Sequence, residues 1–144
     1  MVEQDTIKLL KECDVGVKMG ISSIEDVLDN VSDNNFEKML TLCMDEHKKL
    51  NDEINGLLEK YNDDGKEPAA MAKGMSWIKT NVMLTMDGSD NTVADLMTDG
   101  CNMGVKSLNK YLNKYKAADE VSKDVAKRLI NLEEKLAVDI RGYL

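Results

Sequence analysis

Apolar side chains recur at alternating spacings of three and four residues along four long stretches of the chain, with charged side chains between them. This period is typical of amphipathic helices that bury one stripe. The pattern predicts helices over about residues 5–30, 33–61, 91–117 and 120–143, with Ser32 and Asp119 as N-cap residues of the second and the last. Helices of about 25 residues are roughly 38 Å long, a length typical of helical bundles.

Two kinds of connection separate these helices. The break at residues 31–32 is short and predicts a tight antiparallel hairpin. Residues 62–88 instead form a long crossover, in which Gly65 ends the second helix and Pro68 opens a shorter fifth helix. We therefore expect an all-α fold, an antiparallel four-helix bundle of two hairpins joined by this crossover, built as a single domain over residues 1–144.

A short motif occurs twice, near the middle of the first and the third predicted helices. Residues 13–18 read Cys-Asp-Val-Gly-Val-Lys, and residues 101–106 read Cys-Asn-Met-Gly-Val-Lys. Segments in the second and the fourth helices also correspond, at a spacing of 86 residues. The two hairpins are therefore predicted to be related by an internal repeat, in which His47 corresponds to Glu133.

The acidic balance of the chain argues against polyanionic partners. Its formal net charge is −8 at pH 7, whereas nucleic-acid binding and attraction to anionic lipid surfaces depend on clustered Lys and Arg. No apolar run approaches the roughly 20 residues of a membrane span. The N-terminal residues lack the basic and apolar regions of a signal peptide, and three Cys residues form no disulfide framework. We therefore expect a cytoplasmic protein that binds neither nucleic acid nor membrane.

Four polar side chains are expected near the middle of the bundle, one on each long helix: Asp14, His47, Asn102 and Glu133. In a structural interpretation, Asp14 accepts a hydrogen bond from His47 and the set fixes helix register. The alternative is a site for a transition metal such as iron, manganese or zinc, whose candidate ligands are Asp14, His47, Glu133 and Cys43. A single His and the lack of a Cys-x-x-Cys pair favour the structural interpretation.

Other chemistries have less support in the sequence. A hydrolytic triad would need a nucleophile beside His47, but the Ser residues lie mostly near helix ends. Residues 62–65 and 87–90 resemble fragments of calcium loops without the alternating oxygen ligands and the terminal Glu of an EF-hand. The Met residues fit inward positions, which favours core filling over an adaptable peptide-binding surface. A small-molecule sensor with a ligand in the bundle core stays open as a third class.

The tight hairpin, the long crossover, the related second hairpin and Cys-x-x-Gly in the first and third helices together resemble the small bacterial ferritin-like bundles of unknown function. In the wider ferritin-like family, a di-iron or di-manganese site uses a Glu on each of two helices and a Glu-x-x-His on each of the others. In the bundles of unknown function an acidic residue commonly follows the glycine, but here Val17 and Val105 stand there. Glu-x-x-His does not occur, since Lys49 stands three residues after Glu46. The resemblance implies a ferritin-like fold without the di-metal ligand set.

Two functional hypotheses follow from these observations. The first is a non-enzymatic, ferritin-like bundle protein with a structural, interaction or stress-related role, which needs no cofactor and self-associates or binds a protein partner. The second is a metal-binding ferritin-like protein, an oxidoreductase or a metal-handling protein, that uses the polar residues at the middle of the bundle.

Overall fold

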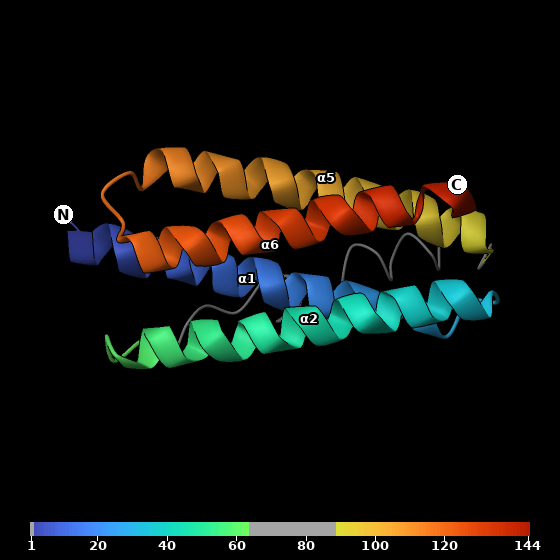
Figure 1. Ribbon diagram of the computed structural model, residues 1–144, viewed down its shortest axis with the longest axis horizontal. Coiled ribbons are helices and arrows are strands. Elements are labelled where there is room, and N and C mark those ends of the chain that lie inside the picture. Colours follow the sequence, from blue (N-terminus) through green and yellow to red (C-terminus); the bar gives the residue numbers. More distant parts are fainter. Residues whose placement is uncertain (1, 64–88) are drawn as a thin grey trace.

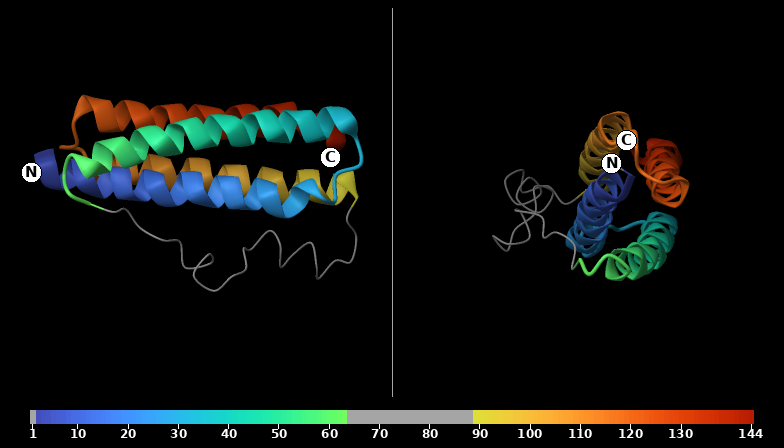
Figure 2. Two further views of the ribbon diagram at one scale, coloured as in Figure 1. Left: turned by 90° about the horizontal axis from the view of Figure 1, so that it is seen from below. Right: turned by 90° about the vertical axis from the view of Figure 1, so that its left-hand side faces the viewer.

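The computed structural model describes residues 2–63 and 89–144, which form four long helices and no strand. These are α1 (Val2–Leu28), α2 (Asn34–Glu59), α5 (Asp90–Lys114) and α6 (Glu120–Asp139), and a short 3₁₀ helix, η1 (Arg141–Tyr143), follows α6. The long helices lie side by side (Figure 1) and surround one centre when viewed end-on (Figure 2). The prediction of an all-α helical bundle is confirmed. The predicted fifth helix falls within residues 64–88, outside the described residues.

None of the described helices combines the length with the apolar character that crossing a membrane requires.

Side-chain caps mark where three of the helices begin, and Ser89 is the cap of α5, since its Oγ accepts from the backbone N–H of Thr92 at 3.4 Å. Asp33 Oδ1 accepts a hydrogen bond from the backbone N–H of Phe36 at 2.9 Å, so Asp33, rather than the predicted Ser32, is the N-cap of α2. The turn before α2 is therefore one residue longer than predicted. Asp119 caps α6 as predicted, because its Oδ1 accepts from the backbone N–H of Ser122 at 2.8 Å.

Contacts at the two ends of the bundle hold the helices together. At one end, the Asp90 carboxylate accepts hydrogen bonds from the backbone N–H groups of Ser32 (2.8 Å) and Asp33 (3.0 Å). At the other end, Thr6 Oγ1 accepts a hydrogen bond from the backbone N–H of Asp119 at 2.8 Å. The start of α5 therefore lies beside the turn that follows α1, and the start of α6 lies beside the start of α1.

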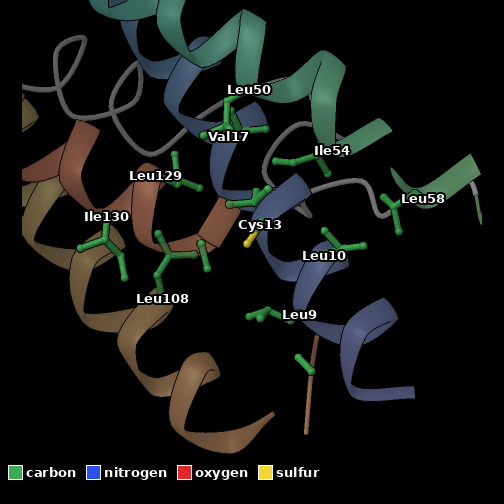
Figure 3. Close-up of a cluster of buried hydrophobic side chains, with 13 residues drawn as sticks. Leu9, Leu10, Cys13, Val17, Leu50, Ile54, Leu58, Leu108, Leu129 and Ile130 are labelled. Atoms are coloured by element: carbon green, nitrogen blue, oxygen red, sulfur yellow. The ribbon is translucent and has the colours of Figure 1, made fainter. Parts of the chain in front are cut away.

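Two apolar clusters fill the interior, one in each half of the bundle. The first lies toward the turn between α1 and α2, and its larger members are Ile24, Val27, Phe36, Leu40, Val93, Leu96, Met97, Leu136 and Ile140. The second fills the opposite half (Figure 3), and its larger members are Leu9, Leu10, Val17, Leu50, Ile54, Leu58, Leu108, Val125, Leu129 and Ile130. Each such side chain contributes about 1.5–3 kcal/mol when fully buried, so these two clusters are the main source of stability.

Candidate functional site

Between the two apolar clusters, each long helix contributes one residue to a small site: Gly20 from α1, His47 from α2, Gly104 from α5 and Glu133 from α6. His47 and Glu133 are only 1% and 9% exposed. The glycines lie against them, since a Cβ built on Gly20 would be 3.5 Å from Glu133 Oε1 and one on Gly104 would be 3.7 Å from Glu133 Cδ. We call this meeting point of four helices the polar junction.

His47 is held at both ring nitrogens by hydrogen-bond acceptors. Nδ1 lies 2.8 Å from the backbone carbonyl oxygen of Cys43, one turn earlier on α2, and Nε2 lies 2.9 Å from Glu133 Oε1. A carbonyl oxygen can only accept a hydrogen bond, so Nδ1 donates to it, and Nε2 donates likewise when the Glu133 carboxylate is ionised. The geometry therefore fits an imidazolium ion at His47, paired with the Glu133 carboxylate.

The surroundings of His47 act on its pKa in opposite directions. Burial alone would lower the pKa, because it disfavours the charged ring. The side-chain hydrogen bonds with the Cys43 sulfur and with Glu133, together with the negative charge of Glu133, outweigh burial, and they raise the pKa of His47 from 6.5 to about 10. His47 is therefore charged at neutral pH, and with Glu133 it forms a buried ion pair.

Gly20 is the residue that allows the ring of His47 to reach Glu133. A Cβ on Gly20 would lie 2.6 Å from His47 Cδ2 and 2.7 Å from His47 Nε2, well inside the separation of about 3.5–4.0 Å at which carbon atoms make favourable contact. Glycine costs a helix interior up to about 1 kcal/mol relative to Ala. The close approach of the imidazole ring is the physical reason for a glycine at this position of α1.

The thiols of Cys13 and Cys101 are chemically quiet. All three cysteines, Cys13, Cys43 and Cys101, are free and buried. Burial, followed by the charge of Glu133 and a hydrogen bond with it, raises the pKa of the Cys101 thiol well above its ordinary value. Burial, with neighbouring carboxylates adding to it, raises the pKa of Cys13 to about 12. The thiolate is the form that attacks substrates or ligates metals, and Cys13 and Cys101 are protonated at neutral pH.

Asp14 is paired differently from the predicted hydrogen bond with His47. It is fully buried, at 0% exposed, and its Oδ2 accepts a hydrogen bond from Lys18 Nζ at 2.9 Å, one turn later on α1. Gly20, the α1 residue beside His47, lies six residues after Asp14, which is about 9 Å along the helix. Asp14 therefore lies at a different level of the bundle from the polar junction.

Three of the four predicted metal ligands, His47, Glu133 and Cys43, do come together. Cys43 Sγ lies 3.6 Å from His47 Nδ1, whereas Glu133 Oε1 lies beside Nε2. Sulfur and carboxylate thus face different ring nitrogens, and they cannot share one ion with His47. Within residues 2–63 and 89–144, no group of three or more His, Cys, Asp or Glu side chains is arranged to hold a metal ion. The chemistry available at the polar junction is that of a buried ion pair.

Sequence reasoning missed one part of this site and placed another wrongly. It did not single out Gly20, and it expected Asn102 at the middle of the bundle, where the structure has an exposed side chain instead. The signal that could have found Gly20 is a spacing of four between glycines in both halves, as Gly16 and Gly20 and as Gly100 and Gly104. Residues four apart lie on one face of a helix, so each pair predicts a shallow face that another group can approach closely.

Comparison of this chain with protein-family models, with curated proteins and with solved structures gives no match.

Proposed function

We propose that this chain is a non-enzymatic helical-bundle protein with a structural or interaction role, in which the polar junction fixes how the four helices pack. The observation that carries this proposal is the saturation of His47, whose two ring nitrogens both lie within hydrogen-bond distance of oxygen atoms inside the protein. A protonated imidazole has no lone pair for a metal ion and cannot take a proton from a nucleophile. The single histidine of the chain is thereby engaged in packing.

Energetics supports a role for this ion pair in specifying the packing. Removing one partner of a buried ion pair typically costs about 3–5 kcal/mol, whereas replacing both with well-packed apolar residues is often neutral or stabilising. A buried pair such as His47 and Glu133 therefore adds little net stability over an apolar core. It does penalise any arrangement of the helices that separates the two charges.

We propose further that the four helices follow the antiparallel, ferritin-like order of two related hairpins. Two observations support this order. The start of α5 contacts the turn after α1, where Asp90 binds Ser32, and the start of α6 contacts the start of α1, where Asp119 binds Thr6. In addition, the hydrogen-bonded residues His47 and Glu133 are 86 positions apart, the spacing of the predicted internal repeat.

Metal analysis tests the non-enzymatic proposal against a metal-binding ferritin-like protein. The full chain is purified without chelator, dialysed against iron, manganese or zinc in turn, and analysed by inductively coupled plasma mass spectrometry. We expect well below one ion per chain, because binding would have to remove a proton from His47 and break its bond with Glu133. A stoichiometric metal would overturn the proposal. If that metal were lost in an Asp14→Ala, His47→Ala double variant, the rival metal site would gain support, and metal retained by that variant would place the ion elsewhere.

The interaction role has its own test in the exposed apolar residues of α2 and α6. Leu42 and Val138 are 66% and 51% exposed. Leu42 precedes Cys43, a member of the first apolar cluster, and Val138 follows Ala137, which packs against that cluster. We expect sedimentation equilibrium to show reversible self-association that weakens in a Leu42→Lys, Val138→Lys variant. Val121→Lys is the matched control, because Val121 is 54% exposed near the opposite end of α6. A wild-type chain that stays monomeric and unchanged by these substitutions would exclude self-association through Leu42 and Val138.

A further inference from the structure

A cavity of about 280 Å³ lies between α1 and α5, and Leu129 and Glu133 of α6 also line it. Two glycines spaced four residues apart lie at the cavity on each of these helices: Gly16 and Gly20 on α1, and Gly100 and Gly104 on α5. A glycine has no side chain, so each leaves open a space that another residue would fill. An apolar cavity of about 150 Å³ in another protein holds benzene, which corresponds to roughly 25 Å³ per carbon atom. On this scale the cavity has room for about eleven carbon atoms.

The cavity is long in relation to its volume. Its lining residues extend from Glu12 to Ser23 on α1 and from Met97 to Tyr111 on α5. The shorter of these stretches measures about 16 Å along the helix axis, at about 1.5 Å per residue. Carbon–carbon bonds of about 1.5 Å at angles near 111° advance an extended alkyl chain by roughly 1.25 Å per carbon, so about 13 carbons span this length. Volume and length therefore both fit an unbranched chain rather than a compact ring system.

The charged side chains at the cavity already have partners. Glu133 pairs with His47 and is hydrogen-bonded to the Cys101 thiol, and Glu12 has a partner as well. Among the described lining residues there is no Lys, Arg or His. A charged group placed in the cavity would therefore lose its hydration without gaining a counter-ion, which is costly. The chemistry of the lining favours an uncharged ligand.

Three methionines make the lining adaptable, namely Met19, Met97 and Met103. Flexible thioethers fill irregular gaps and adjust to the shape of a ligand. Met19 and Met103 are 40% and 58% exposed, so the cavity is open to solvent beside them. A hydroxyl group on a bound chain can therefore stay in contact with water while the methylene groups lie against the methionines and glycines.

From this geometry we propose that the cavity between α1 and α5 binds an uncharged, unbranched alkyl chain of about ten to thirteen carbons, as a fatty alcohol has. The affinity comes from removing methylene groups from water, and it needs no ionic contact with the protein. The net charge of −8 disfavours the approach of fatty acids, whose carboxylates are negative at neutral pH.

Probes of graded length, and of equal carbon number but different charge or shape, test this proposal on the full chain. 1-Hexanol, 1-octanol and 1-decanol are titrated into ¹⁵N-labelled protein at pH 7, and binding is followed by shifts of the amide signals of Gly20, Cys101 and Gly104. We expect the affinity to rise by about fourfold for each added methylene group.

Decanoate and 1-adamantanol have as many carbon atoms as 1-decanol and serve as controls for charge and shape. We expect decanoate to bind roughly tenfold more weakly than 1-decanol or worse, because its carboxylate finds no cation at the cavity. We expect a similar loss for 1-adamantanol, because a compact cage contacts only part of an elongated lining.

Two variants separate binding in the cavity from non-specific binding. Gly104→Leu adds a side chain at the cavity, where the nearest atom to its Cβ is Glu133 Cδ at 3.7 Å, an ordinary contact. Met103→Glu changes an exposed residue and places a negative charge at the opening, so it does not depend on filling the interior. Gly56→Leu is the matched control on α2, because a Cβ there meets nothing within 4 Å. We expect the first two variants to weaken 1-decanol binding by roughly tenfold or more and Gly56→Leu to keep it, with all three folded by circular dichroism.

Four outcomes would overturn the proposal. An affinity for 1-adamantanol equal to that for 1-decanol would show that the cavity does not select an extended chain, and equal affinity for decanoate would show that it does not select against charge. Binding of 1-decanol that persists in both Gly104→Leu and Met103→Glu would place the ligand elsewhere on the protein. Absence of any amide shift with 1-decanol at its solubility limit would show that the cavity does not take up alkyl chains.

Discussion

A Gly20→Ala substitution gives the sharpest test of the polar junction. The new Cβ would lie 2.6 Å from His47 Cδ2, so the ring must retreat by about 1 Å to reach ordinary contact. Its nitrogens are fixed at 2.8 Å and 2.9 Å from their acceptors, and this shift breaks the bond with Glu133. Overpacking typically costs about 1–3 kcal/mol, and weakening the buried pair adds to that cost. Against a gain of up to about 1 kcal/mol from helix propensity, we expect a net loss of about 2 kcal/mol.

The same substitution elsewhere provides the control. A Cβ on Gly56 of α2 meets nothing within 4 Å, so Gly56→Ala should stabilise the protein by about 0.5–1 kcal/mol through helix propensity alone. Urea denaturation followed by circular dichroism at 222 nm measures both free energies of unfolding, and equal m-values are required for the comparison. The two alanine substitutions should therefore change stability in opposite directions.

A double-mutant cycle identifies the cause of the loss. In a His47→Ala background the obstructing ring is gone, so adding Gly20→Ala should be neutral or stabilising. If Gly20→Ala stabilises the otherwise wild-type chain as much as Gly56→Ala does, the imidazole ring does not lie against α1 and the reasoning is refuted. A loss that persists without His47 would likewise assign the clash to another neighbour.

Three further predictions concern protonation, thiol reactivity and capping. The pKa of His47 is raised from 6.5 in the unfolded chain to about 10 in the folded protein. Its stabilising contribution is therefore complete below pH 6.5 and is lost as the pH rises through about 10. The difference in unfolding free energy between wild type and His47→Gln should shrink from pH 6 to pH 10. Because burial raises the thiol pKa values of Cys13 and Cys101, an aromatic disulfide reagent should modify neither in the native protein at pH 8 and both in urea. Asp119→Ala removes the N-cap bond of α6 and should cost about 1 kcal/mol in urea denaturation.

The helices could be placed from the sequence because apolar spacing is a local signal, whereas their ends depend on distant residues. The third long helix was predicted over residues 91–117, but α5 ends at Lys114. The backbone N–H of Ala117 donates to the Asp5 carboxylate at 3.0 Å, a contact across 112 positions that ends the helix early. No local pattern contains that information, since Asp5 lies in a different helix.

The candidate site was only partly predictable for a related reason. Periodicity places Asp14, His47 and Glu133 on inward stripes, and all three are buried. It does not give the axial offset between helices, which decides which inward residues meet. Asp14 therefore binds Lys18 on its own helix, and Gly20, which has no side chain to enter a hydrophobic pattern, lies beside His47 instead.

The polar junction is suited to fixing this axial offset, which is the position of one helix relative to another along the bundle axis. The two apolar clusters, one on each side of the polar junction, are built largely of Leu, Ile and Val. Such side chains exchange neighbours at modest cost when one helix slides by a turn along another. The polar junction tolerates such a slide less well, because a shift of one turn would move the His47 ring away from Gly20 and away from Glu133. The glycine is thus as much a part of the packing specificity as the charges, since at Gly20 the imidazole ring fits against α1 and also reaches Glu133.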